Sequence, residues 1–248
     1  MSDRVKAKVV AMRRGGRALA QVRDTLQHTT ELGNTFAQIE ERAQVLIKQA
    51  GFTPSFSTVP GYRWATCIMK NHELCHGIPS SEKRVESGDI ITIDIGLVSD
   101  GYHLDTTVSF GVGEMKSEHE QFLLVGRQAV DAAIGVVKDG ASVYHISRAM
   151  EKRLKKHNYG AVYQLTGHGV GKKLHMEPAI PVYAQKSDKR VRVSSGDTLA
   201  IEVMYAAGDP ELVLSDDGWT YQTKDGSYTA MFEETVLVTD RGYQVLTK

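Results

Sequence analysis

The sequence has few cysteines, no long apolar run and no excess of charge of either sign. Cys67 and Cys75 are the only cysteines among 248 residues, which is too few for a disulfide framework and predicts a reducing compartment, the cytoplasm. No segment approaches the roughly 18 uncharged apolar residues of a membrane-spanning helix. Lys plus Arg and Asp plus Glu both number 30, so the charge balance favours neither nucleic acid nor a membrane as a partner. We expect a cytoplasmic monomer.

Three common active-site motifs are missing as well. The chain has no His-Glu-x-x-His, no glycine-rich phosphate loop ending in Lys-Ser or Lys-Thr, and no Cys-x-x-Cys. Its composition is otherwise that of an ordinary soluble globular protein, with 41% hydrophobic and 24% charged residues. A chain of this length can bury a large core. The function must therefore be sought in the remaining patterns of the sequence.

The main positive feature is an internal repeat. Ser87-Gly88-Asp89 leads through Ile93 to Asp94, and 108 positions later Ser195-Gly196-Asp197 leads through Ile201 to Glu202. Asp105-Thr106-Thr107-Val108 is matched 128 positions later by Glu233-Glu234-Thr235-Val236. A carboxylate thus recurs at the same two places in both parts of the chain. We predict one catalytic domain, residues 1–248, built from two similar halves of about residues 1–112 and 113–248.

The repeat also predicts a site. Halves that face each other across a pseudo-twofold axis would bring together Asp94, Asp105, Glu202 and Glu233. Four carboxylates cannot all remain ionised in one site without a strong cationic partner. A pair of divalent metal ions is the simplest such partner, so the repeat indicates a metal-dependent hydrolase.

Each half is predicted to contain two helices followed by two strands. Helical spacing and capping residues predict helices at about residues 4–29, 35–50, 117–138 and 142–158. Thr35 with Gln38, and Ser117 with Glu120, form predicted capping boxes at two of the helix starts. Strands are predicted within residues 90–110, at 199–204 and at 230–239. These elements together predict an α+β fold.

Residues 90–110 form a predicted β-hairpin, because Asp100-Gly101 is a strong two-residue turn signal. Such a turn pairs Asp105 with Gly96 and leaves Asp94 diagonal to Asp105 on the same face. A four-residue loop would place the two carboxylates directly opposite each other, again on one face. A three-residue loop would separate them and is less favoured. In either favoured register both carboxylates are within reach of a common ion.

A glycine-rich run with a central histidine lies between the halves. Gly167-His168-Gly169-Val170-Gly171 is followed by His175. The glycines allow close backbone packing around one imidazole, and imidazole binds first-row metals alongside carboxylates. Taken alone, the run is equally well explained by a turn with an incidental histidine. Together with four symmetrically placed carboxylates, it indicates a metal site.

These residues occur in the order and at the spacing of a known family, and the sequence resembles the type I methionine aminopeptidases. The motifs that carry the resemblance are Cys75-His76-Gly77-Ile78-Pro79, Asp94 and Asp105, the Gly-His168-Gly run, His175 before Glu177-Pro178, Ile201-Glu202, and Phe232-Glu233-Glu234-Thr235. They extend over nearly the whole chain. The resemblance implies the pita-bread fold, in which two pseudo-twofold-related halves surround a central curved antiparallel sheet.

The resemblance also implies roles for individual residues. The metal ligands would be Asp94, Asp105, His168, Glu202 and Glu233, with Asp105 and Glu233 bridging two divalent ions. The ligand set leaves the metal open between Mn, Fe, Co and Zn. Glu202 would also move the proton of the attacking water to the leaving amine. His175 would stabilise the charge on the scissile carbonyl, and His76 would position the peptide. The substrate would be the N-terminal peptide of a nascent protein.

The pocket for the first residue of the substrate departs from the family pattern. Its implied lining is Phe56, Tyr62, Cys67, Leu174 and Trp219. Tyr62, Cys67 and Trp219 agree with the usual residues. Phe56 stands where a smaller residue is usual, and Leu174 stands where an aromatic residue is usual. The exchange either conserves the pocket volume with a new shape or favours a different small apolar residue.

Neighbouring polar residues are expected to have structural roles. Asp89 and Asp197 are predicted to cap the turns before two strands. Glu234 follows a predicted ligand, so strand alternation directs it to the opposite face of the sheet. His103 and His119 are expected at the surface.

Two other functions compete with the removal of N-terminal methionine. The first is a related pita-bread aminopeptidase or dipeptidase with another first-residue preference, which Phe56, Arg63 and Leu174 favour. The second is a binding module that has lost its activity. Such a protein would be expected to lose ligands, because an empty cluster of carboxylates repels itself. All five ligand positions are present here, which disfavours the binding module.

Overall fold

The computed structural model describes residues 3–248, with side chains from Val5 onward. Residues 1 and 2 of the predicted first half lie outside this range. The helices are α1 (Asp3–Thr29), α2 (Phe36–Gln49), α3 (Ser117–Ile134) and α4 (Val143–Lys156), with the short 3₁₀ helices η1 (Phe56–Thr58) and η2 (Lys186–Lys189). Within the described range, none of these helices has the length and apolar character that crossing a membrane requires.

The strands form one large sheet and one small sheet. The large sheet contains β1 (Thr53–Pro54), β2 (Thr66–Lys70), β4 (Ile90–Ser99), β5 (Tyr102–Gly111), β6 (Gly160–Ala161), β7 (Thr166–Gly169), β8 (Met176–Pro181), β9 (Thr198–Ala206), β12 (Thr229–Thr239) and β13 (Gly242–Val245). Its main path runs β1-β4-β5-β12-β9-β7-β8. The small sheet joins β3 (Glu73–Cys75), β10 (Leu212–Leu214) and β11 (Tyr221–Thr223) in the order β10-β11-β3.

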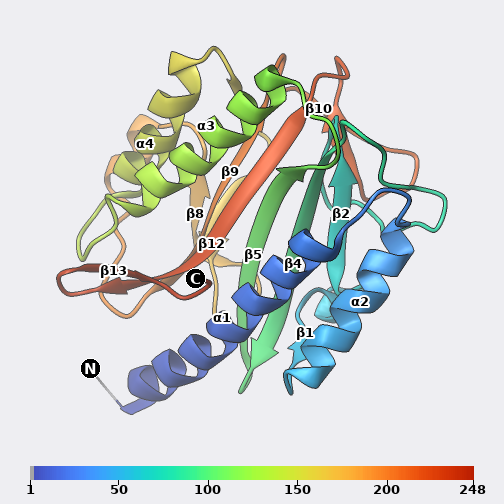
Figure 1. Cartoon of the computed structure of the whole chain (residues 1–248). Helices are drawn as coiled ribbons and strands as arrows, with labels where there is room; N and C mark the ends of the chain where they lie inside the picture. Colours follow the sequence, from blue (N-terminus) through green and yellow to red (C-terminus); the bar gives the residue numbers. More distant parts are fainter. Residues whose placement is uncertain (1–2) are drawn as a thin grey trace.

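The helices cover one face of the large curved sheet (Figure 1). Helix α1 packs on β4 and β5, and α3 packs on β9 and β12. The strands under these helices have fully buried apolar side chains, among them Ile93, Ile95, Ile201 and Val203. Burial of these side chains on the helix face of the sheet supplies the main stabilising contribution to the fold. The mixture of helices with an antiparallel sheet confirms the predicted α+β class.

The two halves use the same local geometry where their sequences repeat. Asp89 accepts a hydrogen bond from the backbone N–H of Glu86 at 2.9 Å, and Asp197 accepts the equivalent bond from Ser194 at 2.8 Å. The glycine before each aspartate has a positive φ, 89° at Gly88 and 96° at Gly196, which a residue with a Cβ rarely adopts. Each aspartate therefore caps the turn before its strand, as predicted.

The starts of α2 and α4 agree with the sequence, since Ser142 is the N-cap residue of α4, whereas the start of α3 differs. Thr35 and Gln38 form the predicted capping box at α2. At α3 the N-cap is Lys116, and Ser117 is already inside the helix, one residue too late for its hydroxyl to cap the first turn. Helix α3 also ends at Ile134, because Gly135 and the residues after it turn away from the helix, rather than at the predicted Lys138.

Candidate metal centre and substrate pocket

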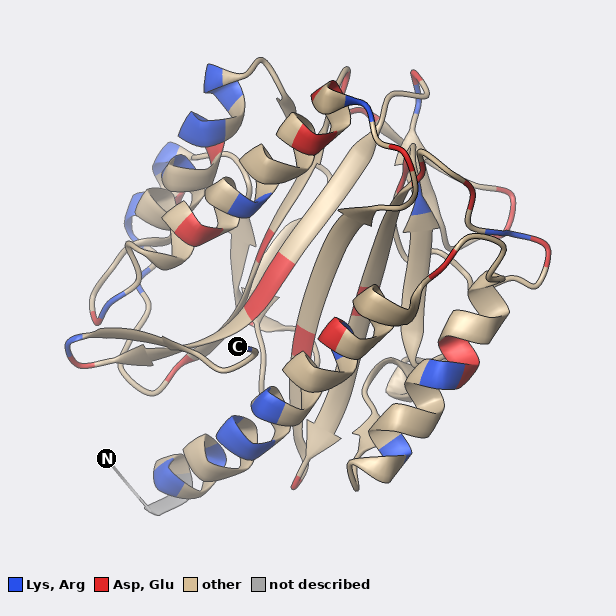
Figure 2. Ribbon diagram, viewed as in Figure 1, with Lys and Arg blue, Asp and Glu red and all other residues tan. Residues whose placement is uncertain are grey.

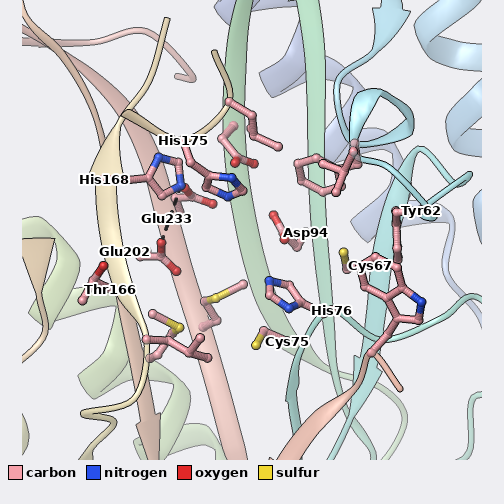
Figure 3. Close-up of a pocket in the computed structure, with 18 of the residues that line it drawn as sticks. Tyr62, Cys67, Cys75, His76, Asp94, Thr166, His168, His175, Glu202 and Glu233 are labelled. Carbon is pink, nitrogen blue, oxygen red and sulfur yellow. Dashed lines mark ion pairs between the residues drawn. The ribbon is translucent and has the colours of Figure 1, made fainter. Parts of the chain in front are cut away.

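The residues predicted for the site line one cavity of about 350 Å³. The predicted residues found in its wall are His76, Asp94, Asp105, His168, His175, Glu202, Glu233, Phe56, Tyr62, Cys67, Leu174 and Trp219. Figure 3 shows His168, His175, Glu202 and Glu233 on one side of this pocket and Tyr62 and Cys67 on the other. One wall is therefore polar and ligand-rich, and the facing wall is mainly apolar.

The β4–β5 hairpin delivers the first two carboxylates. Asp100 and Gly101 form its two-residue turn with φ values of 49° and 74°, a conformation that favours Asp and Gly. The resulting register pairs Asp105 with Gly96 and Asp94 with Thr107. Asp94 and Asp105 are therefore diagonal neighbours on one face, which confirms the predicted hairpin geometry.

The other two carboxylates come from the second half. Glu202 on β9 is paired directly with Glu233 on β12, and Glu233 is also paired with Thr107 across to β5. The Thr107 hydroxyl lies 2.8 Å from a carboxylate oxygen of Asp94 and 2.8 Å from one of Glu233. A hydroxyl has only one hydrogen to donate, so the metal-free site needs a proton on a carboxyl group to satisfy both contacts.

His168 adds a nitrogen ligand at the same place. Its Nδ1 lies 2.9 Å from the carbonyl oxygen of Gly169 and donates its hydrogen there, which leaves the Nε2 lone pair free. Nε2 is 4.0 Å from a carboxylate oxygen of Glu202. One ligand atom each of Asp105, His168 and Glu233 lie within 4.8 Å of one another. These three residues could hold one ion between them.

The protonation equilibria of the carboxyl groups reflect their burial and crowding. Burial raises the pKa of Asp94 to about 7. Burial and the charge of Asp94 raise the pKa of Glu202, and burial together with the neighbouring carboxylates raises that of Glu233 and Asp105. A bound divalent cation opposes these shifts, because it favours the ionised form of each ligand. The set of donors fits a metal ion better than it fits an empty cavity.

One buried atom points to the same conclusion. Asp105 is 5% exposed, and its Oδ1 is a buried oxygen without a hydrogen-bond partner. An unsatisfied buried carboxylate oxygen is costly. A ligand bond to a cation would satisfy this oxygen. Burial also lowers the pKa of His168 to about 4, so its imidazole is neutral and able to bind a metal at pH 7.

Two further histidines flank the ligands. The ring centroids of His175 and His168 are 4.6 Å apart, and the His76 ring lies 5.9 Å from that of Tyr221. Burial lowers the pKa of His175, and burial with the nearby charge of His175 lowers that of His76. Both rings are therefore neutral at pH 7, and each retains one N–H for donation to a substrate.

The apolar wall is rigidly packed. The Tyr62 ring meets Trp219 edge-on at 5.1 Å, and its hydroxyl donates to the carbonyl oxygen of Thr66 at 2.8 Å. Phe56, Cys67 and Leu174 are each less than a tenth exposed. This wall forms a preorganised slot for an apolar side chain.

The sequence did not identify every residue of the site. The further residues in the pocket wall are Val59, Cys75, Gln164, Leu165, Thr166, Met204 and Met231. Thr107 was also missed, although the matching Asp-Thr-Thr and Glu-Glu-Thr segments contained the signal. The predictions for His103 and His119 were wrong. His103 is half-buried with Nδ1 2.7 Å from the Ser55 hydroxyl, and His119 is 6% exposed against the ring of Tyr228.

Comparison with known proteins agrees with this geometry. The model of metallopeptidase family M24 matches residues 10–240. Methionine aminopeptidase 1 of Bacillus subtilis is 35% identical over 237 residues, which cover 96% of this chain and 95% of the relative. Methionine aminopeptidase 1 of Mycobacterium tuberculosis is 32% identical over 99% of this chain and 94% of the relative.

Solved structures give the same result for the fold. The crystal structure of methionine aminopeptidase from Thermotoga maritima superposes with a TM-score of 0.94 at 33% identity, covering 98% of this chain and 97% of that one. Prolidase from Pyrococcus furiosus has a TM-score of 0.79 at 22% identity and covers 98% of this chain and 64% of that one, which shows a shared fold alone. These matches confirm the predicted pita-bread fold. The chain belongs to metallopeptidase family M24, and within it to the methionine aminopeptidases.

Proposed function

We propose that this protein is a metal-dependent aminopeptidase that removes the N-terminal methionine from peptides and nascent proteins. The observation that carries the proposal is the cluster of Asp105, His168 and Glu233, with ligand atoms within 4.8 Å of one another, at one side of a pocket whose other side is apolar. Asp94 and Glu202 complete the proposed ligand set. The two free cysteines, both buried, support a cytoplasmic location, and we propose a monomer without nucleic-acid or membrane partners.

The five ligands would hold two divalent ions from among Mn, Fe, Co and Zn. A dinuclear centre of this kind lowers the pKa of bound water to about 7 and polarises a carbonyl oxygen. Asp105 and Glu233 come from opposite halves, and both would help to hold the ions. Asp94 would bind one ion, and His168 with Glu202 the other.

The protein's own groups would then carry out the proton transfers and the orientation of the peptide. Glu202 would accept a proton from the attacking water and deliver it to the nitrogen of the leaving amine. His175, neutral at pH 7, would donate its N–H to the scissile carbonyl oxygen as negative charge develops there. His76, on the opposite side of the pocket, would contact the peptide beyond that bond and hold it in line.

The proton-transfer role can be tested by Glu202→Gln, which keeps the size of the side chain. We expect turnover of a Met-Ala-Ser peptide to fall by about 10²- to 10⁴-fold, while part of the Co(II) binding is retained. Free methionine release and Co(II) content are measured on the same preparation. Near wild-type turnover in this variant would contradict the assigned role.

A second function differs only in the first residue of the substrate. Phe56 and Leu174 both line the pocket, and their combination is unusual for the family. We therefore compare cleavage of Met-, Leu-, Ala- and Pro-Ala-Ser peptides by the protein, by Phe56→Ala, by Leu174→Phe and by the double variant. Preference for methionine supports the main proposal. Preference for leucine or alanine, reversed in the double variant, would favour an aminopeptidase or dipeptidase of altered specificity with the same proposed metal chemistry.

A further inference from the structure

The two halves of the protein meet along a seam between β5 and β12 that has little regular backbone pairing. Only Glu233 and Thr107 are paired in register across it among the described residues. Elsewhere side-chain hydroxyls connect the strands. Thr235 Oγ1 accepts from the Asp105 N–H at 3.0 Å and donates to the Asp105 carbonyl oxygen at 2.8 Å. Ser109 makes the same pair of bonds to the backbone of Met231, at 2.8 and 2.9 Å.

This seam sets the spacing of the two proposed bridging ligands. Asp105 belongs to β5 and Glu233 to β12, so any change in strand separation moves one ligand relative to the other. A connection between two backbones through a side-chain hydroxyl contains more rotatable bonds than a direct N–H to C=O hydrogen bond. The distance between the two strands can therefore adjust. A further constraint is needed to hold the strands at one separation.

The constraint lies on the helix face, directly behind the ligands. Glu234 is fully buried, and its carboxylate accepts from Arg23 Nη1 at 2.9 Å and from Arg127 Nη1 at 3.0 Å. Arg23 also donates to the Thr106 hydroxyl at 2.9 Å, and that hydroxyl donates to the backbone carbonyl of Glu233 at 2.8 Å. A continuous chain of hydrogen bonds, most of them to a charged group, therefore ties both strands of the seam together.

The two arginines come from corresponding helices of the two halves. Arg23 is on α1 and Arg127 is on α3, the first helix of each predicted half, and their side chains are 7% and 31% exposed. Each helix thus contributes one guanidinium to a single carboxylate at the seam. Figure 2 shows acidic residues at the middle of β12, with basic residues on the helices that cross in front of the sheet.

We infer that Arg23, Glu234 and Arg127 form a positioning clamp that fixes the separation of Asp105 from Glu233 and thereby sets the affinity of the metal centre. None of the three touches the pocket, so they are positioning residues and not catalytic ones. The inference rests on the proposed function, because it assigns the clamp to the same two bridging ligands.

The test measures metal binding, because a merely structural ion pair would change stability alone. Metal-free wild type, Arg127→Gln, Arg127→Lys and Glu234→Gln are titrated with Co(II) in a calorimeter, and the visible absorption of bound Co(II) is recorded. Arg127 is the milder site, since Glu234 keeps Arg23 when Arg127 is replaced. We expect Arg127→Gln to weaken Co(II) binding by at least tenfold and to alter the absorption. Arg127→Lys, which keeps a cation, should recover part of the affinity.

A matched control comes from another buried carboxylate. Glu40 is 4% exposed and accepts from the backbone N–H groups of Ala65 and Thr66 at 2.7 and 2.9 Å, and it does not line the pocket. Glu40→Gln should lower the unfolding temperature and leave the Kd for Co(II) within twofold of wild type. If Arg127→Gln binds Co(II) as tightly as wild type, or if Glu40→Gln weakens binding as much, the clamp is overturned and the proposed function stands. If wild type itself binds no Co(II), the proposed function fails, and the clamp with it.

Discussion

Glu233 and Glu234 are adjacent on β12 and have opposite surroundings. Glu233 faces the pocket, where its neighbours are Asp94, Asp105 and Glu202, and none of the described residues in the pocket wall is Lys or Arg. Glu234 faces the helices and is bound by two guanidinium groups. The pleat of one strand thus places Glu234 beside the protein's own cations and places Glu233 in the proposed metal site.

The comparison explains why one strand can serve both stability and metal binding. An internal ion pair neutralises the carboxylate on the helix face permanently, which holds the two halves together. On the pocket face the protein provides crowded carboxyl groups with raised pKa values. Crowding of this kind destabilises the metal-free protein and favours the binding of a divalent ion.

The largest effects should come from exchanging each carboxylate for an amide. Glu233→Gln should lower methionine release by about 10³-fold or more, because it removes one of the proposed metal ligands. It should also stabilise the metal-free protein at pH 8, because it removes one crowded buried charge. Glu234→Gln should instead destabilise the fold, by up to about 3–5 kcal/mol, because it removes the buried charge that pairs with Arg23 and Arg127.

Both variants are assayed for activity and for urea unfolding in the presence of a chelator. Opposite signs of the change in unfolding free energy would support the contrast between the two faces. If both variants were destabilised equally without metal, the pocket carboxylates would not be under mutual repulsion.

A smaller effect is expected from pH. Burial raises the pKa of Asp94 from 3.8 to about 7, so the folded, metal-free protein binds more protons than the unfolded chain between these values. The contribution of Asp94 to the stability of the metal-free protein is therefore largest at low pH, and it is lost as the pH rises through about 7. We expect the unfolding temperature with chelator to fall between pH 5 and about 8.

Saturating Co(II) should oppose this trend, because metal binding requires the deprotonated ligands. Glu233→Gln serves as the control, since one of the crowded carboxyl groups is then absent and the pH dependence should be shallower. A metal-free unfolding temperature that rises steadily over the same range would contradict the assignment of raised pKa values to the site.

The smallest effect is expected from removing the hydrogen bond between Thr247 and Glu234. The Thr247 hydroxyl donates to Glu234 Oε2 at 2.6 Å and accepts from the Thr235 N–H at 3.0 Å. Thr247→Val should cost about 1–3 kcal/mol, because it leaves the buried N–H of Thr235 without a partner, while Glu234 Oε2 keeps its bond from Arg23. Thr239→Val, at the less buried end of β12, is the matched control in the same unfolding measurement and should change little.

Several features of the fold could be predicted because they depend on few residues close in sequence. The Asp100-Gly101 turn determined the register of the β4–β5 hairpin, and Thr35 with Gln38 determined the start of α2. The start of α3 could not be predicted in this way, since Ser117 matches a capping box in sequence and the helix begins one residue earlier in the structure. Lys116 takes the N-cap position there, and no side chain caps the first turn.

The sequence by itself determined which residues carry the proposed chemistry. The repeated carboxylates and the Gly-His-Gly run have a spacing that few other functions require, and the structure gathers them in one pocket. Alternation along β12 likewise predicted that Glu234 turns away from Glu233. Only the tertiary structure decided what Glu234 meets there. Arg23 and Arg127 lie far from it in sequence, and their convergence depends on how α1 and α3 cross the sheet, which no local pattern encodes.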